Sequence, residues 1–309
     1  MHIIKPPHIQ RGDVIGICAP AGPPNRNALE KGIQYIESLG YRVTLSRNIF
    51  RRHGYLAGTD RQRVSDLHEL FLDKKVKVIF AARGGYGTQR ILPLLNYSLI
   101  KKKPKLVVGY SDITALQLAL FTKAGLTSVT GPVVADMPGT FRKQSEELFW
   151  RTLTSTKPLP PLQSNPEFKI PTGQRFSTGK LMGGNLSLIT ALIGTPFFPR
   201  RNDMILLLED IDERPYRLDR YLQQVKLNGV IARSKGVVLG DFTDCTPAKG
   251  KPSLSIASVF QETFQDYSYP IVSGFRYGHV KNSLTLPIGV TVTLDSKRNE
   301  VKFLDSAVS

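Results

Sequence analysis

The first half of the chain alternates short apolar runs with longer segments in which apolar residues recur every three or four positions. An apolar run closed by Gly or Pro predicts a buried strand, and the longer spacing predicts an amphipathic helix. The runs predict strands over residues 13–20, 41–45, 76–80 and 105–109. Polar residues ahead of the periodic segments predict helices that begin at Asn27, at Asp60 and around Asp112.

Strands that are apolar throughout, alternating with helices, favour a parallel sheet covered by helices on both faces. The predicted fold class is therefore α/β, with an N-terminal three-layer domain of flavodoxin- or amidotransferase-like type. Ligands of such sheets bind beyond the carboxyl ends of the strands. Loops 20–22, 83–85 and 109–111 each follow a predicted strand, so we expect them to converge on one edge of the sheet.

A change in composition separates a second domain from the first. Residues 157–173 contain five prolines and no sustained period, which predicts a linker over residues 154–173. We expect an N-terminal domain over 1–153 and a smaller, mixed α/β domain over 174–309. The strands predicted in the second domain are 204–210, 236–242 and a closing pair within 290–304.

The chain is strongly basic, since 42 Lys and Arg residues against 25 Asp and Glu give a formal charge of +17 over 309 residues. Such a charge suits nucleic acid, an anionic surface or acidic small substrates. The basic residues are spread along the chain, however, and no cluster is interleaved with aromatic residues. We therefore expect no nucleic-acid partner.

Hydropathy predicts a cytoplasmic protein without a membrane segment. No apolar stretch approaches the roughly 18 residues of a membrane helix, and the first residues lack the layout of a signal peptide. Cys18 and Cys245 lie far apart, with no His or second Cys at metal-ligand spacing. We expect two buried thiols, no metal site and no cofactor.

The apolar run 105–109 ends abruptly in the sequence "GYSD", and a helical pattern follows at once. One interpretation is a plain strand-to-helix turn that Ser111 caps. The other is a nucleophile elbow that holds Ser111 out of the sheet, although Ile113 departs from the G-x-S-x-G pattern. In that case the backbone N–H of Asp112 and one from Gly84-Gly85 could stabilise an oxyanion. Phosphate binding by the same glycines is the weaker interpretation, because no phosphate-loop motif is present.

A serine nucleophile needs a base, usually His, that a carboxylate orients. Of five histidines, His279 directly follows Gly278 on a predicted strand-end loop, where close backbone approach is expected. Glu209 and Asp210 end a strongly apolar strand. Burying a carboxylate there costs free energy unless it is hydrogen-bonded or paired. A structural or solvated His279, and an acid that caps the following segment, remain open alternatives.

The motifs "VIGICAPAGP", "ARGGYGTQRILPLL", "VVGYSDITALQLAL", "LLLEDIDERPYRLDRYLQQ" and "GFRYGH" appear in this order. Together they resemble the LD-carboxypeptidase family of serine peptidases, which includes murein tetrapeptide carboxypeptidases and microcin C immunity peptidases. The resemblance implies that Ser111 is the nucleophile, His279 the base and Glu209 its partner. It also implies an oxyanion hole from the N–H groups of Gly85 and Asp112, and a homodimer.

The resemblance implies a serine carboxypeptidase that releases the terminal D-alanine from cytoplasmic murein tetrapeptides during wall recycling. A carboxypeptidase must bind a free carboxylate, and Arg83, Arg214 and Arg217 are candidates because Arg binds carboxylates bidentately.

Two alternatives stay open. An immunity peptidase that cleaves an aminoacyl-nucleotide antibiotic would favour an added aromatic loop that stacks on a base. The sequence shows no such insertion, and Trp150 lies in a helical pattern. A non-enzymatic binding protein is the other alternative, but it would need none of Ser111, Glu209 and His279.

Overall fold

The chain forms two units in the computed structural model, which describes residues 2–168, 170 and 173–309. The first unit comprises Met1–Lys157, Lys281–Gly289 and Ser306–Ser309. The second comprises Pro158–Val280 and Val290–Asp305. Two short segments from the end of the chain therefore belong with its beginning.

The first unit is built on a six-stranded sheet of order β11-β5-β4-β3-β1-β2. Five strands are parallel, and β11 is antiparallel to β5 at the edge. The four strands predicted in the first half are confirmed. The strands are β1 (Val14–Cys18), β2 (Arg42–Leu45), β3 (Val76–Ala81), β4 (Leu106–Gly109), β5 (Ser128–Thr130) and β11 (Leu286–Ile288).

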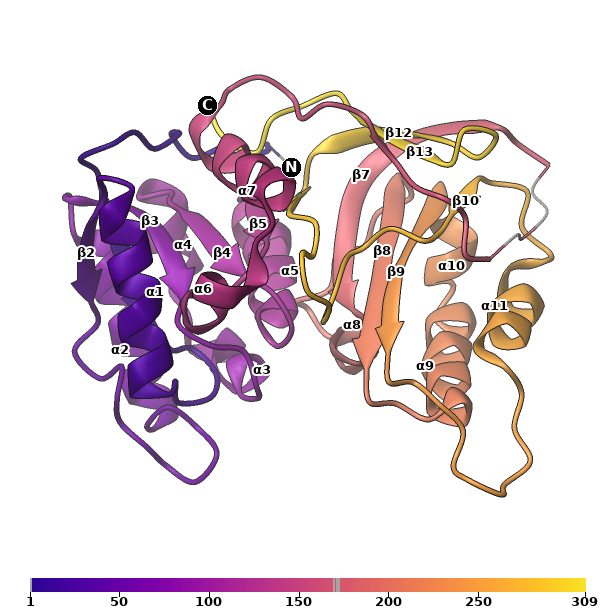
Figure 1. The fold of residues 1–309 in the computed structure, drawn as a ribbon, viewed down its shortest axis with the longest axis horizontal. Coiled ribbons are helices and arrows are strands. Elements are labelled where there is room, and N and C mark those ends of the chain that lie inside the picture. The colour runs from indigo at the N-terminus through magenta and orange to yellow at the C-terminus, as the bar shows by residue number, and fades with distance from the viewer. Residues whose placement is uncertain (1, 169, 171–172) are drawn as a thin grey trace. The chain divides into compact units, whose positions relative to one another are not determined.

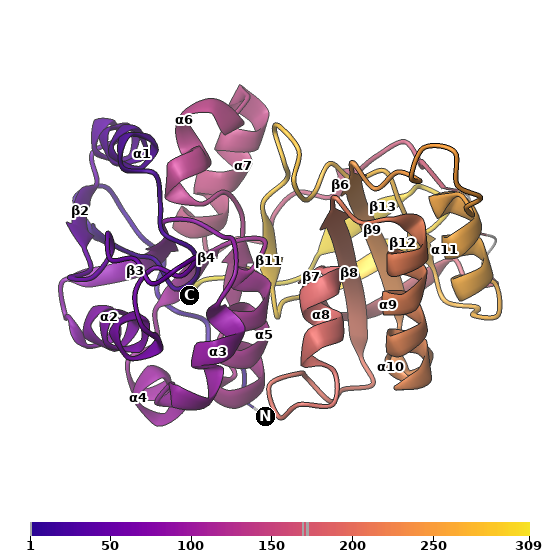
Figure 2. The same ribbon diagram turned by 90° about the horizontal axis from the view of Figure 1, so that it is seen from below.

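Helices cover both faces of this sheet, which confirms the three-layer prediction. Figure 2 shows α1, α6 and α7 on one face and α2, α3, α4 and α5 on the other. The chain runs from β1 outward to β2 and then returns past β1 to β3, so the strand order reverses between β1 and β3. Such a reversal opens a crevice at the carboxyl ends of the two strands.

The helical elements of the first unit are mostly short. They are α1 (Arg26–Ser38), α2 (Asp60–Leu72), α3 (Thr88–Ile91), η1 (Leu92–Leu94), α4 (Tyr97–Lys102), α5 (Ile113–Ala124), η2 (Val134–Asp136), α6 (Met137–Thr140) and α7 (Lys143–Thr154).

Two of the predicted helix caps are wrong by one or two residues. Asn25, not Asn27, caps α1 and accepts from the N–H of Ala28 at 3.1 Å. Thr59, not Asp60, caps α2 and forms a capping box with Gln62. In both cases neighbouring residues are equally able to cap, so the packing of the helix selects among them.

The second unit is a mixed α/β structure, as predicted. Its seven-stranded sheet has the order β10-β9-β8-β7-β12-β13-β6, in which β10 to β7 are parallel and the remaining pairs are antiparallel. The strands are β6 (Leu162–Gln163), β7 (Phe176–Asn185), β8 (Met204–Ile211), β9 (Gly236–Thr243), β10 (Ile271–Val272), β12 (Thr291–Asp295) and β13 (Glu300–Phe303).

Four helices of the second unit pack beside one another, with α9 contacting each of the other three (Figure 1). The parallel strands follow one another across the sheet without reversal, so right-handed crossovers place their helices on one face. The helices are α8 (Leu186–Leu192), α9 (Pro215–Leu227), α10 (Val230–Arg233) and α11 (Ile256–Phe264).

The division of the chain differs from the boundaries expected from composition. Residues 281–289, expected in the C-terminal domain, supply β11, which pairs with β5 of the first unit. Residues 306–309 join the same unit through a bond from Ser309 N to Pro6 O at 2.9 Å. The expected linker over 154–173 contains β6, which pairs with β13, while its residues 169 and 171–172 lie outside the described part.

None of the helices in the described part of the chain combines the length and apolar character needed to cross a membrane.

Gly32 allows α1 to approach η2 closely. A Cβ at this position would lie 2.0 Å from the carbonyl oxygen of Val134. Alanine is usually a better helix former than glycine by about 1 kcal/mol. Here we expect Gly32→Ala to lower the free energy of unfolding by about 1–3 kcal/mol in urea titrations, because the added methyl group would overpack the contact with η2. The exposed Gln34→Ala in the same helix should change it by less than about 0.5 kcal/mol. A Gly32→Ala protein as stable as the parent would contradict this packing.

Candidate active site

The loops that follow β1, β3 and β4 meet at one edge of the first unit's sheet, as predicted. Gly22 N donates to Gly84 O at 3.1 Å, which joins the first two loops. A Cβ added to Gly84 would lie 3.1 Å from the Cβ of Ser111 and 3.3 Å from its Oγ. Glycine therefore lets the second loop lie directly against Ser111.

Ser111 has a positive backbone φ of 62°. Among the described residues, the other non-glycine positions with positive φ are all Asp or Asn, which tolerate this region better than serine does. A strained residue at a strand-to-helix junction is a typical feature of functional sites. The observed backbone thus motivates a catalytic hypothesis for this serine.

Helix α5 begins at Ile113, directly after the turn that contains Ser111, and Asp112 occupies the N-cap position. The Asp112 carboxylate makes no capping bond and instead accepts from Thr88 N and Thr88 Oγ1, both at 2.8 Å. Burial raises the pKa of Asp112, and hydrogen bonds from Thr88 and Gly87 oppose that rise.

In the second unit, Glu209 and His279 form a hydrogen-bonded pair. The Nδ1 of His279 lies 2.8 Å from Oε2 of Glu209. The Glu209 side chain is 1% exposed and that of His279 is 14% exposed, so the pair is largely withdrawn from solvent. An ionised carboxylate can only accept, so a neutral imidazole that bonds to it carries its proton on Nδ1. An imidazole in this tautomer can act as a general base.

Gly278 permits the close approach between the loop and the end of β8. Its φ is +126°, and an added Cβ would lie 2.6 Å from Oε2 of Glu209. Any side chain here would displace the carboxylate that holds His279. The expectation of close backbone approach at Gly278 agrees with this geometry.

Asp210 has a separate role from its neighbour Glu209. Its carboxylate accepts from Asn185 Nδ2, Ser187 N and Ile211 N, each at 2.9 Å. It therefore ties the end of β8 to the start of α8, which precedes it, rather than capping the following segment. Burial, with a smaller effect from Glu209, raises the pKa of Asp210 to about 6.

The three arginines proposed for a terminal carboxylate lie in different places. Arg83 is exposed on the loop after β3 and donates to Pro23 O at 3.0 Å. Arg214 precedes α9 and donates to Thr246 O at 2.9 Å. Arg217 pairs with Glu213 at 3.3 Å, so its charge is already partly matched. Only Arg83 shares a unit with Ser111.

Two residues that organise the first unit's loops were not predicted from the sequence. Thr88 binds Asp112, and the buried Arg63 donates to backbone oxygens of two loops. A signal for Arg63 existed, because it lies four residues before the inward-facing Leu67 on the same helix face. Charged residues are so commonly exposed that this pattern alone carries little information.

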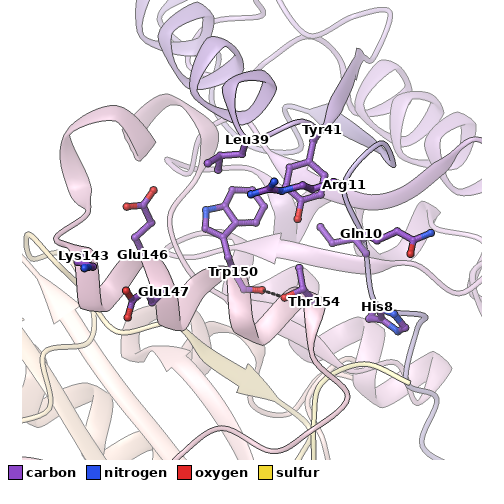
Figure 3. A pocket seen from close by; sticks show the side chains of 11 residues that line it. His8, Gln10, Arg11, Leu39, Tyr41, Lys143, Glu146, Glu147, Trp150 and Thr154 are labelled. Carbon is purple, nitrogen blue, oxygen red and sulfur yellow. Dashed lines mark hydrogen bonds between the residues drawn. The ribbon is translucent and has the colours of Figure 1, made fainter.

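A hollow of about 660 Å³ lies elsewhere in the first unit, at the amino ends of β1 and β2 (Figure 3). Tyr41 stacks on Trp150 in its wall, with ring centroids 4.9 Å apart. The Trp150 N–H donates to the Tyr35 hydroxyl, which donates to Glu146 at 2.5 Å. These polar groups bond to one another, and none of the predicted site residues lines the hollow.

The described residues contain no group of three or more His, Cys, Asp and Glu side chains placed to hold a metal ion. Both thiols are buried, as predicted. Burial raises the pKa of Cys18, and it raises the pKa of Cys245 to about 11, so both are poor nucleophiles and poor metal ligands at neutral pH.

Comparison of the chain with known proteins identifies its family. Residues 15–131 match the model of the LD-carboxypeptidase N-terminal domain, and residues 178–294 match that of the C-terminal domain. A probable murein peptide carboxypeptidase of Bacillus subtilis is 38% identical over 94% of this chain and 92% of its own length. The chain belongs to the LD-carboxypeptidase family. The resemblance inferred from the motifs is confirmed, and the protein is a carboxypeptidase, a hydrolase.

Two further LD-carboxypeptidase relatives bear on its activity. The crystal structure of muramoyltetrapeptide carboxypeptidase from Oxalobacter formigenes is 31% identical, with a TM-score of 0.82 over 93% of this chain and 97% of that one. The microcin C7 self-immunity protein of Escherichia coli is 26% identical over 96% of this chain and 95% of its own length. The predicted α/β fold with two domains is that of the family.

The contact at Gly278 can be tested by substitution. We expect Gly278→Ala to destabilise the protein by about 1–3 kcal/mol and to weaken the Glu209–His279 hydrogen bond, because the new Cβ overlaps the carboxylate. The downfield NMR signal of the His279 Nδ1 proton should broaden or disappear. Gly194→Ala is the control, since Gly194 also has positive φ (+87°) but has nothing within 4 Å of an added Cβ. An unchanged imidazole signal in Gly278→Ala would refute the steric argument.

The raised pKa of Asp210 makes stability depend on pH. The unfolded chain releases this proton near pH 3.8 and the folded protein near pH 6, so folding favours the protonated form. This stabilising contribution is complete below about pH 4 and is lost as the pH rises through 6, by on the order of 3 kcal/mol. We expect the difference in unfolding free energy between wild type and Asp210→Asn to change over this window. Parallel pH profiles of the two proteins would contradict the assignment.

Proposed function

We propose that this protein is a serine carboxypeptidase that hydrolyses an LD-amide bond and releases the terminal D-alanine of murein tetrapeptides. The nucleophile is Ser111, the base is His279, and Glu209 orients the base. The protein acts as a homodimer in the cytoplasm, where it takes part in peptidoglycan recycling. Relatives named as murein peptide and muramoyltetrapeptide carboxypeptidases support the choice of substrate.

The reaction begins when Ser111 Oγ attacks the carbonyl carbon of the scissile amide and His279 Nε2 accepts its proton. The backbone N–H groups of Gly85 and Asp112 stabilise the negative charge on the carbonyl oxygen. The protonated imidazole then donates to the leaving nitrogen, which departs as D-alanine. Water, deprotonated by the same imidazole, hydrolyses the acyl-enzyme and releases the shortened peptide.

The observation that carries this proposal is the buried hydrogen bond between Glu209 and His279. Burying a carboxylate costs free energy unless it is hydrogen-bonded or paired, and His279 supplies that partner to Glu209. The mechanism requires Ser111 Oγ to come within hydrogen-bonding distance of Nε2 of this imidazole. The strained backbone at Ser111 supports its role as the partner.

For the terminal carboxylate of the substrate we favour Arg83 over the other two arginines. It is exposed, and it lies two residues before Gly85 on the same loop. Its guanidinium has five N–H donors, and one of them donates a hydrogen bond to Pro23 O. Arg217 is less suited because Glu213 already pairs with it.

A second candidate function is the cleavage of an aminoacyl-nucleotide antibiotic, which the similarity to a microcin C7 self-immunity protein supports. Stacking on the base would need an accessible aromatic side chain near the reacting atoms. Trp150, on α7, does not supply it, because it stacks on Tyr41 and donates a hydrogen bond to the Tyr35 hydroxyl. We rank this substrate class second because this chain is 38% identical to the probable murein peptide carboxypeptidase and 26% identical to the self-immunity protein.

The proposal is tested by following D-alanine release from a murein tetrapeptide. Wild type should release it, and Ser111→Ala should be slower by at least about a thousandfold, because the acyl-enzyme cannot form. Ser128→Ala is the matched control, since Ser128 is a buried serine of the same unit whose hydroxyl has no hydrogen-bond partner among the described residues.

Equal release by wild type and Ser111→Ala would overturn the nucleophile assignment. If a well-folded wild type releases no D-alanine but cleaves an aminoacyl sulfamoyl nucleoside, the second candidate function is correct instead.

A further inference from the structure

The two proposed oxyanion donors lie on different segments of the chain. Gly85 belongs to the loop after β3, whereas Asp112 begins the turn into α5. Two donors stabilise a transition state only when both are held within a fraction of an ångström of the required place. Something in the first unit must therefore fix one segment against the other.

The side chain of Thr88 joins the two segments directly. Its N–H and its Oγ1 each lie 2.8 Å from Oδ2 of Asp112, and Oγ1 also lies 2.5 Å from the Asp112 carbonyl oxygen. Thr88 is fully buried and Asp112 is 1% exposed. Thr88 lies three positions after Gly85, so this contact fixes the end of the glycine loop beside the first N–H groups of α5.

Arg63 fixes the same loop from the other side. Its Nη1 donates to Gly87 O at 2.7 Å and to Pro20 O at 2.5 Å, which joins the loops after β3 and β1. The guanidinium also pairs with Asp60, which is held by Arg90 at 2.9 Å. Arg63 is only 1% exposed. A buried cation that serves two backbone carbonyls constrains both loops more than a neutral side chain could.

We propose that Thr88 and Arg63 are positioning residues of the oxyanion hole, acting through the N–H groups of Asp112 and Gly85. This inference rests on the proposed function, since it assumes that these two groups face the reacting carbonyl oxygen. Both residues are buried, so we assign them no direct contact with the substrate. Their removal should raise the energy of the tetrahedral transition state and leave the affinity for the planar substrate unchanged.

The test compares Thr88→Val with Thr88→Ser in D-alanine release. Thr88→Val keeps the shape but loses the hydroxyl bond, so kcat should fall by about 10- to 100-fold with KM within about twofold. A peptide phosphonate, which carries tetrahedral anionic oxygens, should bind more weakly by a similar factor. Thr88→Ser restores the hydroxyl and should recover kcat to within about threefold of wild type.

Thr152→Val is the matched control. Thr152 is another buried threonine of the first unit, and its hydroxyl donates to Leu148 O at 2.7 Å on α7. This variant should keep kcat and phosphonate affinity even if it loses stability. If Thr88→Val is too unstable to purify, Arg63→Lys replaces it, because one ammonium group cannot reproduce the planar fork of the guanidinium. The same fall in kcat at constant KM is expected.

The outcomes separate this inference from the proposed function. Equal activity of Ser111→Ala and wild type would overturn both. Loss of activity in Ser111→Ala, together with Thr88→Val behaving like Thr152→Val, would overturn only the positioning role. A change confined to KM would also overturn it, because that result would mean that Thr88 shapes substrate binding instead of the transition state.

Discussion

The geometry of the strand-end loops depends on one buried carboxylate. Asp112 is withdrawn from water, and its charge is tolerated only because donors from Thr88 and Gly87 replace the lost hydration. Those donors belong to the neighbouring loop, so satisfying the carboxylate also fixes the glycine segment against the start of α5. The same turn keeps Ser111 in a backbone conformation that serine rarely adopts unaided.

In the second unit, two consecutive buried acids, Glu209 and Asp210, likewise hold neighbouring segments in place. At the end of β8, Glu209 holds the imidazole of His279 while Asp210 holds the start of α8 through Asn185. The ladder to β9 shifts register between Leu208 and Asp210. Irregularities of this kind re-aim side chains beside functional sites. One strand end therefore holds the His279 imidazole with one carboxylate and the start of α8 with another.

Strands β1, β3 and β4 were predictable because their burial on both faces leaves nearly continuous apolar runs. Helix starts were predictable only to within two residues, since several residues near Asn25 and Thr59 can cap. The contact between Glu209 and His279 could not be derived from spacing, because the two residues are 70 positions apart in the sequence. Only family resemblance linked them. The roles of Arg63 and Thr88 depend on contacts between loops that no local pattern encodes.

The return of β11 to the first sheet has a consequence for biosynthesis. The chain crosses between its two units four times, at residues 157/158, 280/281, 289/290 and 305/306. Until residues 286–288 have been made, β5 remains an unpaired edge with exposed backbone donors and acceptors. The first unit therefore cannot complete its sheet when residues 1–157 have been translated, because its edge strand β11 is made later. When the protein is expressed at a high level, this edge can pair with other nascent chains until residues 286–288 leave the ribosome.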